Sequence, residues 1–190
     1  MFSLELRDTD DRTARGYGMA CIAGTDARAP ATYDPTLIKH LTSDHASLQD
    51  SLGRLEDHAQ HRQFAKIPGT LARFRNDLHR HIEEENLHFY AYVAHAFRED
   101  PLIAERLDRT SARMAGIARL VTLFTRHYTE IPVTAANRDA FIRDLDVIAS
   151  LLGDRIDLEE KTLYALYQSP YRALQLPDEE CLAHLECAPD

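Results

Sequence analysis

Hydrophobic residues recur at intervals of three and four positions in four long segments of this chain. Such spacing places them along one face of an α-helix. The segments run from about residue 35 to 60, from 70 to 98, from 101 to 129 and from 135 to 168. No segment alternates hydrophobic and polar residues as a half-buried strand does. The pattern therefore predicts four amphipathic helices and no strand.

Capping and helix-breaking residues stand between these segments. Asp34 is a good N-cap residue, and Pro35 directly after it suits the first helical position. Pro68 and Gly69 precede the second segment. The connections are short, and short connections make consecutive helices antiparallel. We therefore expect an all-α fold, an up-down-up-down four-helix bundle over residues 34–168.

The two ends of the chain lack this helical periodicity. Residues 1–33 hold scattered glycines and charges, and we interpret them as a flexible N-terminal arm. Residues 169–190 hold three prolines and an acidic run at 178–180. We interpret them as an acidic C-terminal tail that contains one short helix near residues 181–185.

Five polar residues interrupt the hydrophobic faces of three predicted helices. They are His45 in the first, His81 and Glu85 in the second, and Arg155 and Glu159 in the fourth. Counting from the shared turns brings them level to within about five residues, or roughly 8 Å. We therefore expect them in one or two adjacent layers of the core. Buried carboxylates are costly without a cation, so the glutamates need either a metal ion or the guanidinium of Arg155.

Three segments of the chain resemble the hemerythrin-like (HHE cation-binding) family. The first helix carries HLTSDHASLQDSL, where the family shows an acidic residue followed by histidine. The second carries LHRHIEEENLHFY, close to the His-apolar-x-x-Glu-Glu signature of the family. The fourth carries RIDLEEKTLYALY, which looks like a second copy of that signature with Arg155 in place of histidine. The resemblance implies a hemerythrin-like bundle in which His45, His81, Glu85 and Glu159 are metal ligands.

The chain departs from the full ligand set of that family, in which five histidines and two carboxylates hold a di-iron centre. The third helix usually contributes two histidines, and the matching positions here are Thr110 and Met114. Arg155 replaces the histidine of the fourth helix, and His127 lies about 20 Å of helix beyond Met114. We therefore predict no normal di-iron centre and no reversible O₂ binding. The remaining ligands are expected to hold one Fe or Zn ion.

The other histidines are expected to lie away from this layer. His88 and His95 share the hydrophobic face of the second helix, but we expect them near the end of the bundle and partly exposed. His40 and His79 are expected at the surface. The sequence leaves open whether His40, His79 or His88 adds a ligand.

Charge and cysteine content limit the partners and the compartment. The chain has 22 lysines and arginines against 31 aspartates and glutamates, a formal net charge of −9. Nucleic-acid and anionic-membrane binders need a basic face, so we expect neither partner. No apolar run is long enough for a transmembrane helix, and the first residues lack the apolar core of a secretory signal. The three cysteines show no CxxC spacing, so we expect a reducing, cytoplasmic location.

Two functions from different classes fit these observations. The first is a hemerythrin-like protein with a partial metal site, regulatory or sensory in role. The alternative is a metal-free regulator that binds a protein partner through its surface. That reading rests on a looser resemblance to the sigma-factor-binding Rsd/AlgQ-type regulators, which are four-helix bundles with a similar arginine-containing helix. We expect no enzyme, since the sequence offers no nucleophile–base set, phosphate loop or redox CxxC.

Overall fold

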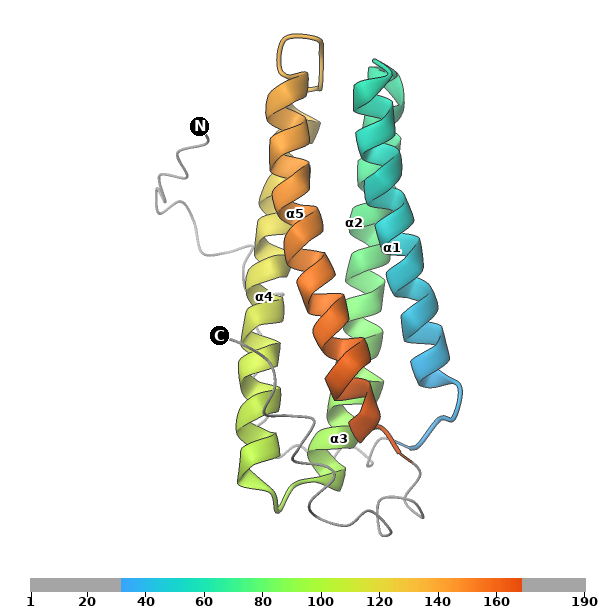
Figure 1. Cartoon of the computed structure of the whole chain (residues 1–190), viewed down its shortest axis with the longest axis vertical. Helices are drawn as coiled ribbons and strands as arrows, with labels where there is room; N and C mark the ends of the chain where they lie inside the picture. Colours follow the sequence, from blue (N-terminus) through green and yellow to red (C-terminus); the bar gives the residue numbers. More distant parts are fainter. Residues whose placement is uncertain (1–31, 169–190) are drawn as a thin grey trace.

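Four long helices lie side by side along the long axis of the molecule (Figure 1). The computed structural model describes residues 32–168 apart from the side chain of Ser111. The long helices are α1 (Leu37–Gln60), α2 (Ile67–Glu84), α4 (Pro101–Glu130) and α5 (Arg138–Leu158), and a short helix, α3 (Ala91–Ala96), continues the line of α2. Helices α1 and α4 each contact both α2 and α5. The predicted all-α four-helix bundle is confirmed, and the described residues contain no strand.

The helices begin at positions that the capping chemistry explains. The Asp34 carboxylate accepts hydrogen bonds from the backbone N–H and the hydroxyl of Thr36, at 2.8 and 2.7 Å, so the turn that it forms precedes α1. Pro68 lies inside the first turn of α2, where its missing N–H costs nothing, rather than before the helix as predicted. Asp100 caps α4 by accepting from the N–H groups of Leu102 and Ile103 at 3.0 and 3.2 Å.

Two short π-helical turns interrupt the α-helical geometry. One spans Glu85–Tyr90 between α2 and α3, and the other spans Glu159–Leu163 directly after α5. A π-turn accommodates one extra residue, so the helix presents a different face after it. His88 and His95 share the hydrophobic face in the sequence pattern but are exposed, as expected for both, and Phe89 and Val93 take their inward places.

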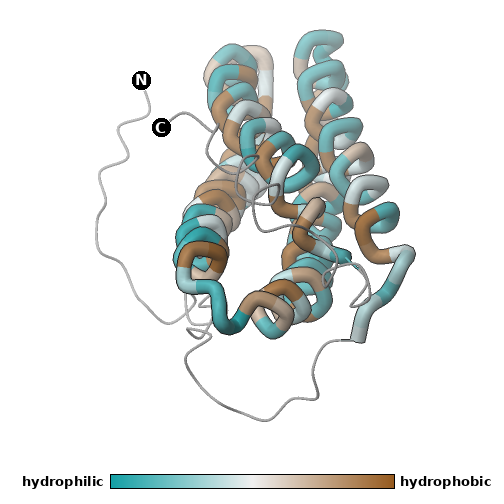
Figure 2. The backbone as a smooth tube through the Cα atoms, turned by 60° about the horizontal axis from the view of Figure 1, so that its bottom comes forward, coloured by the Kyte–Doolittle hydropathy of each residue, from teal (hydrophilic) through white to brown (hydrophobic). Residues whose placement is uncertain are grey.

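Apolar side chains fill the interior in two separate clusters. One cluster occupies the part of the bundle near the α1–α2 turn and includes Leu48, Leu78 and Leu152. The other occupies the opposite end and includes Leu41 and Phe89. Hydrophobic and polar residues are interspersed along every helix, as amphipathic helices of a bundle require (Figure 2).

The start of the described chain packs against the end of the last helix. The Tyr33 ring stacks on Tyr167 with a centroid distance of 5.1 Å and lies 5.8 Å from the Tyr92 ring. The backbone N–H of Asp34 donates to the Tyr167 hydroxyl at 2.8 Å. Tyr33, which the sequence assigned to the N-terminal arm, therefore belongs to the packed domain. Residues 1–31 of the predicted arm and the predicted tail (169–190) lie outside the described residues.

Among the described helices, none is both long and apolar enough to cross a membrane.

Candidate metal centre

A layer of polar side chains crosses the bundle between the two apolar clusters. On α1 it is His45, which lies between Leu41 and Leu48, residues that belong to different clusters. The other members of the layer also lie between the two apolar clusters. All members are at most 5% exposed: His45, His81, Glu85, Thr110, Arg155 and Glu159. The five polar residues that counting along the helices placed at one level therefore do lie in one layer of the structure. The role of these side chains as metal ligands remains a prediction.

Two imidazoles and one carboxylate face a common point within this layer. The Nε2 atoms of His45 and His81 are 3.1 Å apart, and His45 Nε2 is 3.4 Å from the Glu159 Oε2 atom. The three donor atoms all lie within 4.8 Å of one another. Ligand bonds of about 2.0–2.2 Å separate neighbouring donor atoms around one metal by about 3.0–3.5 Å. The spacing of the nitrogen and oxygen atoms thus suits a single ion.

A carboxylate lies behind each imidazole, on the side away from that point. His45 Nδ1 is 2.8 Å from Glu160 Oε1, and because a carboxylate only accepts, the nitrogen donates. His81 Nδ1 is 3.8 Å from Asp44 Oδ2, too far for a hydrogen bond. Both of these atoms are buried, and neither has a hydrogen-bond partner. Carboxylates behind metal-bound histidines fix the ring tautomer and orientation in many metal sites.

Arg155 occupies the other side of the layer. Its guanidinium contacts Glu159 Oε1, lies 3.5 Å from Glu85 Oε2, and donates to the Tyr90 hydroxyl at 2.5 Å. Glu159 therefore turns one oxygen toward the histidines and the other toward Arg155. Both oxygens of Glu85 are also engaged, since the Tyr164 hydroxyl donates to Oε1 at 3.3 Å.

Burial and neighbouring charges set the protonation of this layer. Burial, together with the neighbouring His45 and Arg155, lowers the pKa of His81 to about 3, so its imidazole is neutral. Burial and the nearby Glu159 raise the pKa of Glu85 well above its usual value. Burial also raises the pKa of Glu159, although Arg155 opposes this shift. The ionised carboxylate that best matches Arg155 is therefore Glu159.

Helix α4 supplies no histidine to this layer. The Thr110 hydroxyl donates to the backbone oxygen of Arg106 in its own helix at 2.9 Å. Met114 is packed in one of the apolar clusters. With Arg155 at the fourth-helix position, the described residues do not fit a di-iron centre. They fit one ion, because the Nε2 atoms of His45 and His81 and one oxygen of Glu159 lie within 4.8 Å of one another.

The remaining histidines lie outside the layer. His40 is exposed and faces Asp44 and Glu84 at 3.7 and 3.6 Å, which makes a second, solvent-exposed group of possible donors. His79 lies 3.6 Å from Glu83 at the surface. His127 lies on α4 with its ring 4.7 Å from that of Tyr128, at the other end of the bundle. Within the described chain, none of these residues contributes to the buried group of three donors.

Four residues of the site were missed by sequence reasoning. Asp44 and Glu160 directly neighbour His45 and Glu159 in the chain, so adjacency to a candidate ligand was the available signal. Tyr90 and Tyr164 reach the layer from within or just after the π-helical turns. No hydrophobic periodicity reports such a turn, so these hydroxyls left no signal in the sequence.

Comparison with known families gives one match. A family model described as the hemerythrin HHE cation binding domain matches residues 36–167, well over half of the chain. No curated protein and no solved structure matches the chain.

Proposed function

The chain belongs to the hemerythrin HHE cation-binding family, and we propose that it holds one iron or zinc ion in a regulatory or sensory role rather than carrying O₂. His45, His81 and Glu159 are the proposed ligands. When bound, the ion supplies positive charge and a Lewis-acidic centre in the middle of the bundle. Glu85, a ligand by family resemblance, is already engaged by Arg155 and Tyr164.

The unpaired atoms of His81 and Asp44 carry this proposal. The two Nε2 atoms at 3.1 Å cannot face each other without a proton between them, and a cation can take the place of that proton. If His81 offers its Nε2 lone pair, the neutral ring carries its proton on Nδ1, which faces Asp44 Oδ2. If these two atoms move closer than their present 3.8 Å, the Nδ1–H group of His81 can donate a hydrogen bond to Asp44. Neither atom has a hydrogen-bond partner without the ion.

Arg155 supports one ion rather than two. Its guanidinium lies on the side of Glu159 opposite to the histidines and cannot lose its charge at ordinary pH. A second cation there would meet this charge inside a buried layer with no ligand from α4. A single ion on the histidine side leaves the contact between Arg155 and Glu159 in place.

Metal analysis of the purified protein tests the proposal. We expect about one ion per chain after incubation with Fe²⁺ or Zn²⁺ and desalting, and no absorption band of an oxo-bridged di-iron centre. His81→Ala and Glu159→Gln should reduce the bound metal at least tenfold. His40→Ala, which removes the exposed histidine near Asp44, is the matched control and should keep it. Two ions per chain, or equal loading of His81→Ala and the parent, would contradict the proposal.

The ion pair between Arg155 and Glu159 also favours a second candidate, the metal-free regulatory bundle. Arg155 neutralises one buried carboxylate, and burial raises the pKa of Glu85 and so favours its neutral form, which lets the layer approach charge balance without an ion. In that case no metal remains after desalting. The melting temperature then stays the same with chelator and with added metal.

A further inference from the structure

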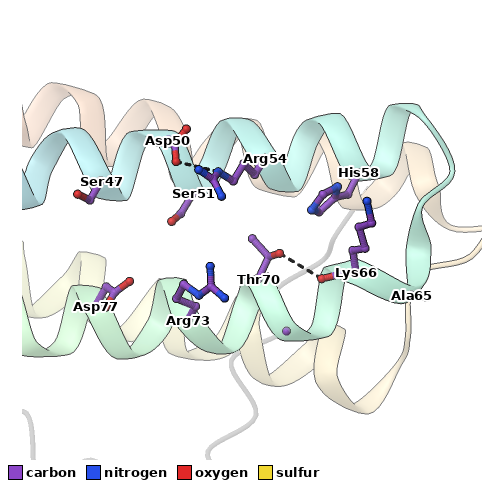
Figure 3. Close-up of a pocket in the computed structure, with 11 residues that line it drawn as sticks. Ser47, Asp50, Ser51, Arg54, His58, Ala65, Lys66, Thr70, Arg73 and Asp77 are labelled. Atoms are coloured by element: carbon purple, nitrogen blue, oxygen red, sulfur yellow. Dashed lines mark hydrogen bonds and ion pairs between the residues drawn. The ribbon is translucent and has the colours of Figure 1, made fainter.

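A polar groove runs along the outer seam between α1 and α2, on the half of these helices toward their connecting turn (Figure 3). Small residues keep it open. Ser47 and Ser51 lie one helical turn apart on α1, and Gly69 lines the groove from the start of α2. A Cβ atom added at Gly69 would meet nothing within 4 Å. The leucines of α1 point to the other side, into the core, so the groove is separate from both the core and the metal centre.

Three permanent cations enter this groove from both sides. Arg54 comes from α1, Lys66 from the residue before α2, and Arg73 from α2 (Figure 3). Arg54 uses its Nε atom to bind Asp50 at 2.8 Å. Lys66 and Arg73 have no carboxylate partner in the described part of the chain. In a protein with a net charge of −9, two neighbouring cations without a carboxylate partner are unusual.

The two carboxylates of the groove are already paired. Asp50 is held by Arg54, and Asp77 faces Arg80, which does not line the groove, at 3.5 Å. The free charge of the groove is therefore positive. Lys66 also precedes the first turn of α2, so the positive end of that helix points to the same place.

Ser51 adds a hydroxyl donor to the lining of the groove. Its residue is only 8% exposed, and its side chain makes no hydrogen bond with any described residue. It lines the groove and points from α1 toward α2 (Figure 3). This hydroxyl faces the groove and can donate to an oxygen of a bound anion.

We propose that this groove binds the phosphate group of a small molecule, or free phosphate. Lys66 and Arg73 supply the charge, the free nitrogens of Arg54 add further donors, and Ser51 donates one hydrogen bond from the floor. A tetrahedral dianion matches this mixture of cations and a hydroxyl better than a carboxylate, which offers fewer acceptor oxygens.

Amide chemical shifts of the full chain test this proposal. Chelator-treated protein is titrated with inorganic phosphate and, separately, with glycerol phosphate, and sodium chloride of equal ionic strength serves as reference. Because the protein is free of metal, the result does not depend on the metal centre. We expect saturable shifts at Ser51, Gly69 and Thr70 with at least one phosphate compound. Saturation by glycerol phosphate alone identifies an ester as the ligand, and saturation by both or by inorganic phosphate alone identifies the phosphate group itself.

Three substitutions separate specific binding from general attraction. Arg73→Gln, Lys66→Gln and Ser51→Ala should each weaken phosphate binding about fivefold. Arg119→Gln, which removes an exposed cation of α4, is the charge-matched control and should leave binding unchanged. The proposal is overturned if chloride reproduces the shifts, or if Arg73→Gln and Arg119→Gln bind phosphate equally well while both remain folded.

Discussion

Arg155 places a permanent positive charge within a buried layer that also holds two glutamates. It is 5% exposed and contacts both carboxylates and the Tyr90 hydroxyl. Its Nε and Nη1 atoms have no hydrogen-bond partner, so its interactions are concentrated on Nη2. The negative charge of Glu159 raises the pKa of Arg155 despite the opposing effect of burial. The guanidinium therefore stays charged and is the fixed counter-ion of this layer.

Removal of this charge should destabilise the metal-free protein. Arg155→Ala leaves Glu159 buried without a cation, and we expect a loss of about 3–5 kcal/mol in the free energy of unfolding. Urea denaturation in the presence of chelator measures it. Arg109→Ala removes an exposed arginine that pairs with Glu105 and should change stability by less than about 0.5 kcal/mol. If the two variants are equally stable, Arg155 does not serve as the counter-ion.

His81 should make the stability of the metal-free protein depend on pH. Its pKa is about 3 in the folded state, against about 6.5 for an unfolded chain. Between these values unfolding takes up a proton at His81, so stability falls as the pH falls, by up to about 1.4 kcal/mol per pH unit. Above pH 6.5 this contribution is constant.

The comparison of His81→Gln with the parent isolates this contribution. Denaturation in chelator at several pH values between 4 and 8 should show a difference in stability that shrinks as the pH falls. His95→Gln, at an exposed position, should follow the parent at every pH. A constant difference between His81→Gln and the parent would show that His81 does not resist protonation.

At the scale of the element, the π-helical turns are what bring the tyrosines to the polar layer. Each turn begins at one of the two buried glutamates, Glu85 and Glu159. The extra residue in the first turn moves Phe89 and Tyr90 inward and His88 outward. Such turns arise from a one-residue insertion in an α-helix and often occur at functional sites.

Deletion of Leu87 should remove the first π-turn without unfolding the protein. Leu87 is 49% exposed, and a regular α-helix without it still turns Phe89 and Val93 inward. We expect far-UV circular dichroism close to the parent. We also expect a several-fold loss of bound metal, because Glu85 and Tyr90 both contact Arg155, which in turn holds the proposed ligand Glu159. Deletion of the exposed Gly53 in the regular part of α1 should instead rotate all later core residues by about 100° and unfold the bundle. Full metal binding by the Leu87 deletion would show that the π-turn is not required.

At the scale of the whole molecule, the polar layer divides one bundle into two apolar clusters. The cluster around Tyr92, Tyr164 and Tyr167 lies at the end where the described chain begins and ends. Tyr33 completes it from outside the helices, with rings at 5.1 and 5.8 Å. The boundary of the folded unit is therefore set by this aromatic contact and not by the first helix.

Truncation should place that boundary between residues 31 and 33. Removal of residues 1–31 should leave the melting temperature within about 2 °C of the full chain. Removal of residues 1–33 should lower it by several degrees, since aromatic pairs contribute about 0.5–1.5 kcal/mol each. Tyr33→Ala in the full chain is the control and should reproduce the longer truncation. An equal and large effect of both truncations would place packed residues before Thr32.

The sequence by itself determined the four helices, their antiparallel order and the polar layer. Local spacing decides these features, because a repeat of three and four residues fixes which side chains share a helix face. His45, His81, Glu85, Arg155 and Glu159 could be brought level by counting, since α-helices have a constant rise per residue. Thr110 and Met114 could likewise be identified as the positions where ligands are absent.

Only the tertiary structure decided which of these side chains touch and how. The two π-turns change the phase of a helix without any change in composition, so the exposure of His88 and the burial of Tyr90 could not be read from periodicity. The contacts of His45 with Glu160 and of Arg155 with Glu85 join residues more than sixty positions apart. Such pairings depend on the rotation of whole helices about their axes, which contacts along the full length of the bundle fix together.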